Sequence, residues 1–514
     1  MRGSEMSIRT KTNSSRKRSE RKKPKPVKSN RTGVPKDSSG LKIRMYRVGF
    51  GDFFLITVPT SSGDQYILVD CGVFKGTSGT GDIGSIVEAV EDMYQTTRGH
   101  LALVIMTHRH ADHISGFSKA ERFKSFTAGL VWMPYWERHN DPKDSSNDWF
   151  VDSDEDPLNL LVEIETLAQD LAMQFRGRQD PEAQEALAQL ANATGIEDFN
   201  AAATDKKRTG GNAIALDMLK NYLGDNGRKV RYYKAGDKPE LPTELRGLRA
   251  TILGPPPLKA KAFLALTDLK KGVGQYLDSM TESLGDPEPI RPFSFEWAAD
   301  QREYPNSDRR GILIDYKKIS QDVNNSQPDL LTVAAEKIDT FLNNQSLVVL
   351  FEFAGKKLLF AGDAQAGNWE YWLFNTEKPL KDPTKAGDIF EASKEVLQTI
   401  DFYKVGHHGS TNATPIQAVA EAVSRPESSN GFVSMCSTED HVYGNRDKGT
   451  EVPCIPLMGA LGEGSCLIRS DSFPITMNNP TKKVIQPAAG VNTKLPKPKV
   501  GKLHKANLYI EYSF

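Results

Sequence analysis

Thr107-His-Arg-His-Ala-Asp-His113 decides how the chain is interpreted, because it places three histidines and one aspartate within six residues. Histidine is otherwise scarce, with 9 in 514 residues, so a polar loop without function explains the cluster poorly. The preceding run, Leu101-Ala-Leu-Val-Ile-Met106, has the length and residue types of a buried strand. Ligand-competent side chains therefore follow a strand end, where they can converge. Imidazoles with a carboxylate suit zinc, manganese or iron, and this mixture favours a hydrolytic over a structural site.

The composition describes a globular body behind a basic N-terminal segment. Hydrophobic residues make up 38% of the chain and charged residues 26%. Residues 1–40 hold 13 Lys and Arg against 3 Asp and Glu and almost no apolar residues, which predicts a disordered basic tail. Such a tail could contact polyanions, act as a nuclear import signal or simply be solvated. The remainder carries a net charge of −10, because the whole chain is neutral, and this does not indicate a nucleic-acid coat.

The sequence predicts a cytoplasmic protein with reduced thiols. We find no run approaching the ~20 apolar residues of a membrane span and no apolar core of a signal peptide. The cysteines form no C-x-x-C pair, which favours free thiols over disulfides or a cysteine metal site. They are Cys71, Cys436, Cys454 and Cys466.

Strand and helix patterns predict a mixed α/β layer for the first part of the chain. Three strands are expected at Lys42–Val48, Phe53–Val58 and Gln65–Asp70, followed by a helix over Gly81–Arg98. After the histidine cluster, a helix is expected over Phe117–Phe126.

Two insertions are expected within a single domain of residues 41–514. The first, about 140–228, contains the amphipathic patterns Leu158–Phe175 and Pro181–Ala193. The second, about 258–340, has weak periodicity and is interpreted as short helices and mobile loops.

Three further strand ends carry ligand-competent residues beside glycine. They are Leu68-Val-Asp70-Cys-Gly72, Leu359-Phe-Ala-Gly-Asp363 and Tyr403-Lys-Val-Gly-His407-His408. Each alone is a weak signal, since an Asp beside Gly is usually a turn former. Together with the histidine cluster, they are what a sheet sandwich needs to hold a dinuclear centre along one edge.

These motifs resemble the metallo-β-lactamase superfamily, and within it the branch similar to the soluble hydrolase domain of the DNA-uptake channel ComEC. The resemblance covers residues 42–135 and roughly 343–465, and it implies a four-layer αββα sandwich. The segments that carry it are Val48–Ile56, Ile67–Gly72, Thr107–Gly116, Leu358–Asp363, Lys404–Ser410 and His441–Asn445.

The resemblance implies a metal centre with six ligand residues: His108, His110, Asp112, His113, Asp363 and His407. It places the first two on one ion and Asp112 with His113 on the second. Asp363 then bridges both ions, and His407 completes the second site. Asp70 is expected behind the ligands, where its hydrogen bonds orient the histidines. His408 is expected to contact substrate or stabilise a leaving group, although the roles of His407 and His408 could be reversed.

One departure from the family concerns the first ion. Many members supply it with another histidine between the cluster and the bridging aspartate, whereas this chain has only His139 there. His139 lies in a polar turn that favours a surface position. The expected cofactor is therefore two divalent ions, zinc or manganese, with a single ion as the alternative. The first ion is weakly held, uses Asp or Glu, or is absent.

The expected function follows from this centre. A divalent metal lowers the pKa of a bound water toward neutrality, which supplies a nucleophile without a strong base. Asp112 would orient this nucleophile and take its proton. The resemblance favours a phosphodiesterase or nuclease acting on nucleic acid or nucleotides. The alternatives are a hydrolase of lactones or thioesters and a non-catalytic metal-binding or interaction protein.

Overall fold

The computed structural model describes residues 40–74, 85–138, 157–175, 181–196, 210–264, 328–376, 378–379, 389–412, 414–423, 431–440, 442–444, 451–473, 475–476, 484–485 and 494–514. These residues lie in one compact unit, Pro35–Phe514. The basic tail up to residue 39, His139, His441 and most of the second insertion lie outside the described residues.

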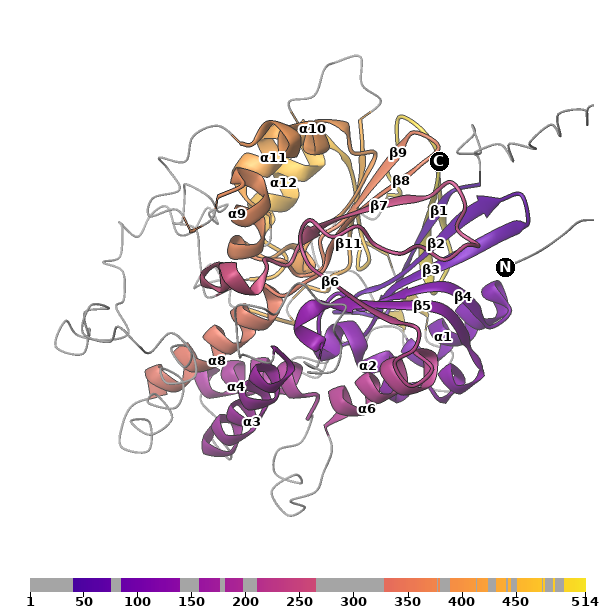
Figure 1. Ribbon diagram of the computed structural model, residues 1–514. Helices are drawn as coiled ribbons and strands as arrows, with labels where there is room; N and C mark the ends of the chain where they lie inside the picture. The colour runs from indigo at the N-terminus through magenta and orange to yellow at the C-terminus, as the bar shows by residue number, and fades with distance from the viewer. Residues whose placement is uncertain are drawn as a thin grey trace, which may run out of the picture. The chain divides into compact units, whose positions relative to one another are not determined.

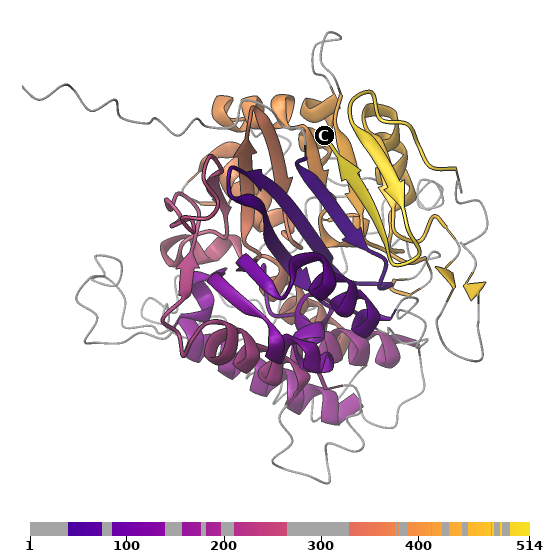
Figure 2. The ribbon, with the colours of Figure 1, turned by 90° about the vertical axis from the view of Figure 1, so that its right-hand side faces the viewer.

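The first sheet has eight strands in the order β15-β16-β1-β2-β3-β4-β5-β6. Its early strands pair antiparallel, and β3 to β6 are parallel. The last strand of the chain, β16, pairs with the first, β1, as the yellow and indigo arrows show (Figure 2). The bounds are β1 Lys42–Tyr46, β2 Phe53–Thr60, β3 Gly63–Cys71, β4 His100–Ile105, β5 Thr127–Pro134, β6 Val230–Tyr233, β15 Lys502–Lys505 and β16 Tyr509–Ser513.

The second sheet has six strands in the order β12-β11-β10-β9-β8-β7. It follows the same plan, since β7 to β9 pair antiparallel and β9 to β12 are parallel. A separate short ribbon joins β13 and β14. The bounds are β7 Arg249–Gly254, β8 Val348–Phe353, β9 Lys356–Phe360, β10 Phe402–Lys404, β11 Val433–Cys436, β12 Cys466–Arg469, β13 Ile475–Thr476 and β14 Val484–Ile485.

Alternation along the strands builds a core between the two sheets. In β2, Phe54 and Ile56 belong to the apolar cluster shared with the second sheet, whereas Phe53 and Leu55 face helices. This period of two is what a strand buried on both faces requires. Each such side chain contributes roughly 1.5–3 kcal/mol when fully buried, so the core between the sheets is a main source of stability.

Helices cover the outer face of each sheet (Figure 1). The helices that cover the first sheet are α1 Ile86–Thr97, α2 Ala111–Lys119, α6 Gly211–Asp217, the 3-10 helix η1 Glu121–Ser125 and the π-helix η3 Met218–Leu223. The second is covered by α9 Ala366–Phe374, α10 Glu391–Thr399, α11 Ile416–Val423 and α12 Ile455–Gly464. The result is an α/β arrangement of mixed sheets and helices, compatible with the expected sandwich.

A third helical group joins the two insertions. Helices α3 Pro157–Phe175 and α4 Pro181–Thr194 of the first insertion pack against α8 Pro328–Asn343, which begins in the second (Figure 1). Trp136 of η2 Tyr135–Glu137 completes this apolar cluster, and the turn η4 Leu258–Phe263 lies beside it.

Two details of the described chain bear on the sequence-based expectations. The helix predicted at Phe117–Phe126 is wrong in its bounds, because α2 already begins at Ala111 and ends at Lys119 before a short 3-10 turn. None of the four cysteines forms a disulfide bond. None of the described helices has the length and apolar character that a membrane span requires.

Candidate metal centre

The ends of four strands bring the predicted site residues together. Asp70 lies at the end of β3, and the histidine cluster follows β4, the strand parallel to it. Asp363 follows β9, and His407 with His408 follows the parallel strand β10. Because parallel strands present their carboxyl ends at one edge, each sheet delivers its residues to a single edge, and the two edges face each other.

Asp70 holds the start of the histidine cluster in place. Its Oδ1 accepts a hydrogen bond from the Thr107 backbone at 2.7 Å, and its Oδ2 accepts one from the Thr107 hydroxyl at 2.6 Å. Asp70 Oδ2 also lies 2.8 Å from His113 Nδ1. A carboxylate that accepts from Nδ1 leaves Nε2 of the same ring to face the centre.

Helix α2 begins within the motif and carries Asp112 in its first turn. A carboxylate there interacts favourably with the helix dipole, and the Asp112 backbone N–H donates to Asn192 Oδ1 of α4 at 3.0 Å. The end of β3 approaches closely: a Cβ on Gly72 would lie 2.2 Å from the Asp112 carbonyl carbon. Only glycine at this position lets the strand end and the helix start meet.

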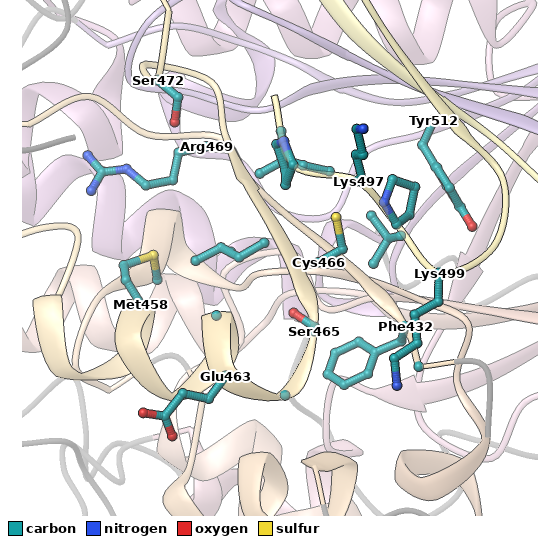
Figure 3. Close-up of a pocket in the computed structure, with 18 of the residues that line it drawn as sticks. Phe432, Met458, Glu463, Ser465, Cys466, Arg469, Ser472, Lys497, Lys499 and Tyr512 are labelled. Carbon is teal, nitrogen blue, oxygen red and sulfur yellow. The ribbon is translucent and has the colours of Figure 1, made fainter. Parts of the chain in front are cut away.

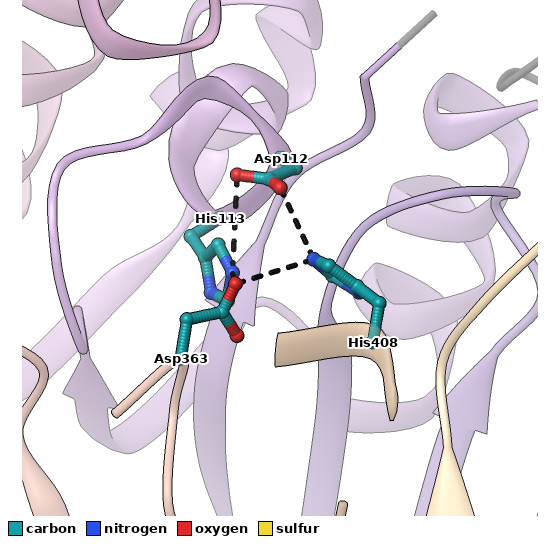
Figure 4. A group of neighbouring side chains, drawn as sticks. All are labelled: Asp112, His113, Asp363 and His408. Carbon is teal, nitrogen blue, oxygen red and sulfur yellow. Dashed lines mark hydrogen bonds and ion pairs between the residues drawn. The ribbon is translucent and has the colours of Figure 1, made fainter. Parts of the chain in front are cut away.

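Four side chains from both sheets converge on one point (Figure 4). They are Asp112, His113, Asp363 and His408, all buried, with ligand atoms within 4.8 Å of one another. Asp363 Oδ2 lies 3.0 Å from His113 Nε2 and 3.4 Å from His408 Nε2. Asp112 Oδ2 lies 3.1 Å from His408 Nε2.

His408, and not His407, belongs to this group. The Ser437 carbonyl oxygen lies 2.7 Å from His408 Nδ1, and a carbonyl can only accept, so Nδ1 carries the proton and Nε2 faces the carboxylates. His407 lies beside its neighbour in a turn where both residues have positive φ, of 42° and 52°. Its ring contacts Asn343, Gln365 and Asn412 instead. The geometry therefore favours the reversed assignment of the two histidines.

His108 and His110 form a second group with Asp112. The Nε2 atoms of both rings are buried and have no hydrogen-bond partner among the described residues. Burial lowers the pKa of His108 and lowers the pKa of His110 to about 4, so both rings are neutral and able to bind metal near neutral pH. Asp339 of α8 lies 3.8 Å from His110 Nε2.

Sequence reasoning assigned no role to two buried residues beside the first group. Lys404 Nζ forms an ion pair with Asp52 and lies 3.3 Å from Asp363 Oδ1. Asp52 lies 3.7 Å from His113 Nδ1, and its backbone N–H donates to the Asp112 carbonyl at 2.8 Å. Nothing in the local sequence around either residue indicates these partners, which lie far away along the chain.

The centre contains several buried carboxylates, which bound cations would stabilise. Five buried carboxylates each lie within 3.8 Å of a histidine of the centre: Asp52, Asp70, Asp112, Asp339 and Asp363. Burial lowers the pKa of His408, but Asp363 and the hydrogen bond to Asp112 outweigh it and raise the pKa to about 10. Burial raises the pKa of Asp339, and Asp112 and Asp363 raise it further.

The donor set fits divalent metal ions. Among the described residues, buried Asp112 Oδ1 has no hydrogen-bond partner, and His113 Nε2 and Asp363 Oδ2 lie 3.0 Å apart without forming a hydrogen bond of regular geometry. Buried polar atoms are rarely left so. Imidazole nitrogens with carboxylate oxygens are suitable ligands for zinc or manganese. His108, His110, Asp112, His113, Asp363 and His408 are therefore able to hold the expected cofactor.

A separate pocket of about 900 Å³ lies among β11, β12, α12, β16 and the segment 494–500. Lys497 and Lys499 border it together with Phe432, Cys466 and Tyr512 (Figure 3). Its lining mixes lysines with Asp401 and Glu463 and includes none of the grouped His and Asp residues. We place the functional site at the buried cluster, because perturbed ionisable groups converge there.

Neither the known protein families nor the curated proteins contain a match to this sequence.

Proposed function

We propose that the chain is a metal-dependent hydrolase of the metallo-β-lactamase superfamily, similar to the ComEC-like branch, and that it acts on phosphodiesters of nucleic acid or nucleotides. The convergence of Asp112, His113, Asp363 and His408 from two sheets is the observation that carries this proposal. The family assignment rests on the order of the motifs along the chain. The two facing sheets with helices on their outer faces are compatible with its four-layer αββα sandwich.

The charge of the centre supports two ions rather than one. When bound cations keep all five carboxylates ionised and the ligand histidines neutral, the carboxylates and Lys404 together carry four negative charges. Uncompensated buried charges are costly, and two divalent cations would neutralise this set. His108 and His110 would hold one ion, and His113 with His408 the other. Asp112 belongs to both groups of candidate ligands, and Asp363 would contribute to the ion held by His113 and His408.

The chemistry divides between the ions and the protein. A bound divalent cation would acidify a water molecule and offset negative charge that develops on the substrate. Asp112 Oδ1 accepts no hydrogen bond in the described structure and is placed to take the proton of the attacking water. Ser437 and Asp70 hold the rings of His408 and His113, so their Nε2 atoms point inward. Partly buried His407 and Asn412 are suited to contact the substrate.

The substrate class rests on the resemblance and on the basic composition of residues 1–40. The same centre would also hydrolyse a lactone or a thioester, because each reaction needs an activated water and a stabilised oxyanion. Substrate screening therefore belongs in the test.

The full chain is purified, its zinc and manganese are measured by elemental analysis, and hydrolysis of bis(p-nitrophenyl) phosphate is followed. We expect bound metal and turnover in the wild type, and a fall of about a thousandfold in Asp112→Asn. The control is Asp64→Asn, which removes an exposed aspartate from β3 and should retain full turnover.

Three results would count against all or part of the proposal. A wild type that takes up neither metal has no such centre. Bound metal without turnover on phosphodiesters, lactones and thioesters indicates a metal-binding or interaction protein instead. Turnover on a lactone or thioester alone would keep the hydrolase and reject the phosphodiester substrate.

A further inference from the structure

Helix α8 presents two different faces to its surroundings. Ile338 and Phe341 pack into the apolar cluster formed with α3 and α4. Asp339 and Asn343, one helical turn apart, are buried, and the Asn343 amide donates to Asp339 Oδ2 at 2.9 Å. The other carboxylate oxygen, Oδ1, lies 3.8 Å from His110 Nε2. A buried acidic side chain of the insertion thus faces the histidine cluster.

The His108 and His110 side of the centre lacks ligands. Together with Asp112, these residues offer three ligand atoms within 4.8 Å of one another. Zinc usually takes four ligands, and manganese takes more. In the described part of the chain, His110 is the only ion-pair partner of Asp339, although charged side chains are rarely buried without a partner.

We propose that Asp339 is a ligand of the ion held by His108 and His110. Two donors bonded to one ion at about 2.0–2.2 Å lie at most about 4.4 Å apart, so the 3.8 Å between Asp339 Oδ1 and His110 Nε2 is compatible with a shared ion. Asn343 fixes the carboxylate through its other oxygen, as residues behind metal ligands commonly do. The inference rests on the metal centre of the proposed function.

This role gives the second insertion a place in the site. Its helix α8 is held by α3 and α4 of the first insertion, so both insertions would position one metal ligand. The carboxylate also belongs to the set whose charge two cations would balance.

The test measures metal binding and needs no substrate. Metal-free protein is titrated with zinc in competition with a chromophoric chelator, and bound metal is counted after dialysis. We expect two ions in the wild type. In Asp339→Asn, the weaker-held ion should lose affinity by about 10- to 100-fold, while the other ion is unaffected. Asp339→His and Asp339→Glu should restore much of the affinity, since both retain a ligand atom.

The matched control is Glu336→Gln, which removes an exposed acidic group from the same helix and should bind both ions as the wild type does. The visible spectrum of the Co²⁺-loaded protein gives a second readout, because a changed ligand set alters it while a merely structural role does not. If Asp339→Asn is poorly folded, Asp339→His carries the test through its spectrum.

The outcomes separate this inference from the function on which it rests. Unchanged affinities and an unchanged Co²⁺ spectrum in Asp339→Asn would overturn the role of Asp339 and leave the centre standing. The role of Asp339 would also be overturned if the wild type binds only one ion and Asp339→Asn binds that ion with the same affinity. A wild type that binds no metal overturns the proposed function together with the inference.

Discussion

Lys404 is a buried cation that lies against two carboxylates of the centre, Asp52 and Asp363. It pairs with Asp52, lies 3.3 Å from Asp363 Oδ1 and donates to the Gly362 carbonyl at 2.9 Å. Removing one partner of a buried pair leaves an uncompensated charge, so Lys404→Gln should lower the free energy of unfolding by about 3–5 kcal/mol. Urea-induced unfolding of the metal-free protein measures this change.

The matched control is Lys356→Gln, because Lys356 pairs with Asp401 where both side chains are about one-fifth exposed. Solvent screening limits such a pair to about 1 kcal/mol. The double variant Asp52→Asn/Lys404→Gln should recover part of the loss. Equal costs for Lys404→Gln and Lys356→Gln would show that the buried pair has no special weight.

Substitutions of the two neighbouring histidines should affect different properties: one the retention of metal and the other the binding of substrate. His408 Nε2 lies within 3.4 Å of Asp112 and Asp363, whereas the ring of His407 contacts amide side chains. His408→Ala should therefore lose bound metal and lower turnover by about a hundredfold or more. His407→Ala should keep its metal and mainly raise KM. Metal analysis with steady-state kinetics decides, and loss of metal in His407→Ala alone would restore the first assignment.

Much of the site was predictable from residues that follow apolar strands. Asp70, the histidine cluster, Asp363 and the His407–His408 pair all follow or end strands, and the structure brings all of them except His407 into the groups of candidate ligands. Asp52, Lys404 and Asp339 were not predictable as partners, because their roles depend on which distant segments meet. The choice between His407 and His408 depends on a turn with positive φ that the sequence does not specify.

At the scale of elements, a buried ion-pair network fixes the start of α2. Arg109 binds Glu137 of η2 through two hydrogen bonds of 2.8 and 3.0 Å, and Lys220 of η3 donates to Glu137 at 2.9 Å. Burial raises the pKa of Glu137, but Arg109 and Lys220 outweigh it and lower the pKa to about 2. Asn212 of α6 also donates to the Arg109 carbonyl. The network therefore ties two insertion elements to the metal motif.

The lowered pKa predicts a pH dependence of stability. Because Glu137 has a lower pKa in the folded than in the unfolded chain, its contribution is complete above about pH 4.5 and is lost as the pH falls toward 2. Between pH 6 and pH 4, the wild type should lose about 1 kcal/mol more than Glu137→Gln. Urea-induced unfolding at both pH values gives the difference. The control is Glu91→Gln, which removes one partner of an exposed ion pair and should lose as much unfolding free energy between these pH values as the wild type. An equal loss in Glu137→Gln and the wild type would contradict the argument.

Helices and strands were predictable where one hydrophobic period dominates the sequence, and less so where contacts with distant segments determine their bounds. The alternation in β2 and the apolar run of β4 indicated strands, as the structure has them. The start of α2 was missed because the histidine motif has no helical apolar pattern, and Asn192 of a distant helix caps it. Helix α8 was hidden in a segment of weak periodicity, because its apolar face matches α3 and α4 while its polar face meets the centre.

For the whole molecule, the centre joins two sheets that also share an apolar core. Asp112 and His113 come from the first sheet, and Asp363 and His408 from the second, so a bound ion links both halves directly. A ligand that binds only the folded state stabilises it by about 2.7 kcal/mol at a concentration of 100 Kd. Zinc or manganese should therefore raise the Tm by on the order of 5 °C, and chelation should reverse the gain.

The same linkage predicts which substitutions abolish this gain. His408→Ala removes a ligand that the second sheet contributes. Asp363 is then the one ligand of that ion left on the second sheet among the grouped residues. Most of the metal-dependent rise in Tm should therefore vanish. His407→Ala serves as the matched control, because its ring lies outside the ligand group, and it should keep the rise. Calorimetry with and without chelator measures both variants. A rise of equal size in His408→Ala would mean that the ion binds elsewhere, since an ion that no longer bridges the sheets has no reason to stabilise them together.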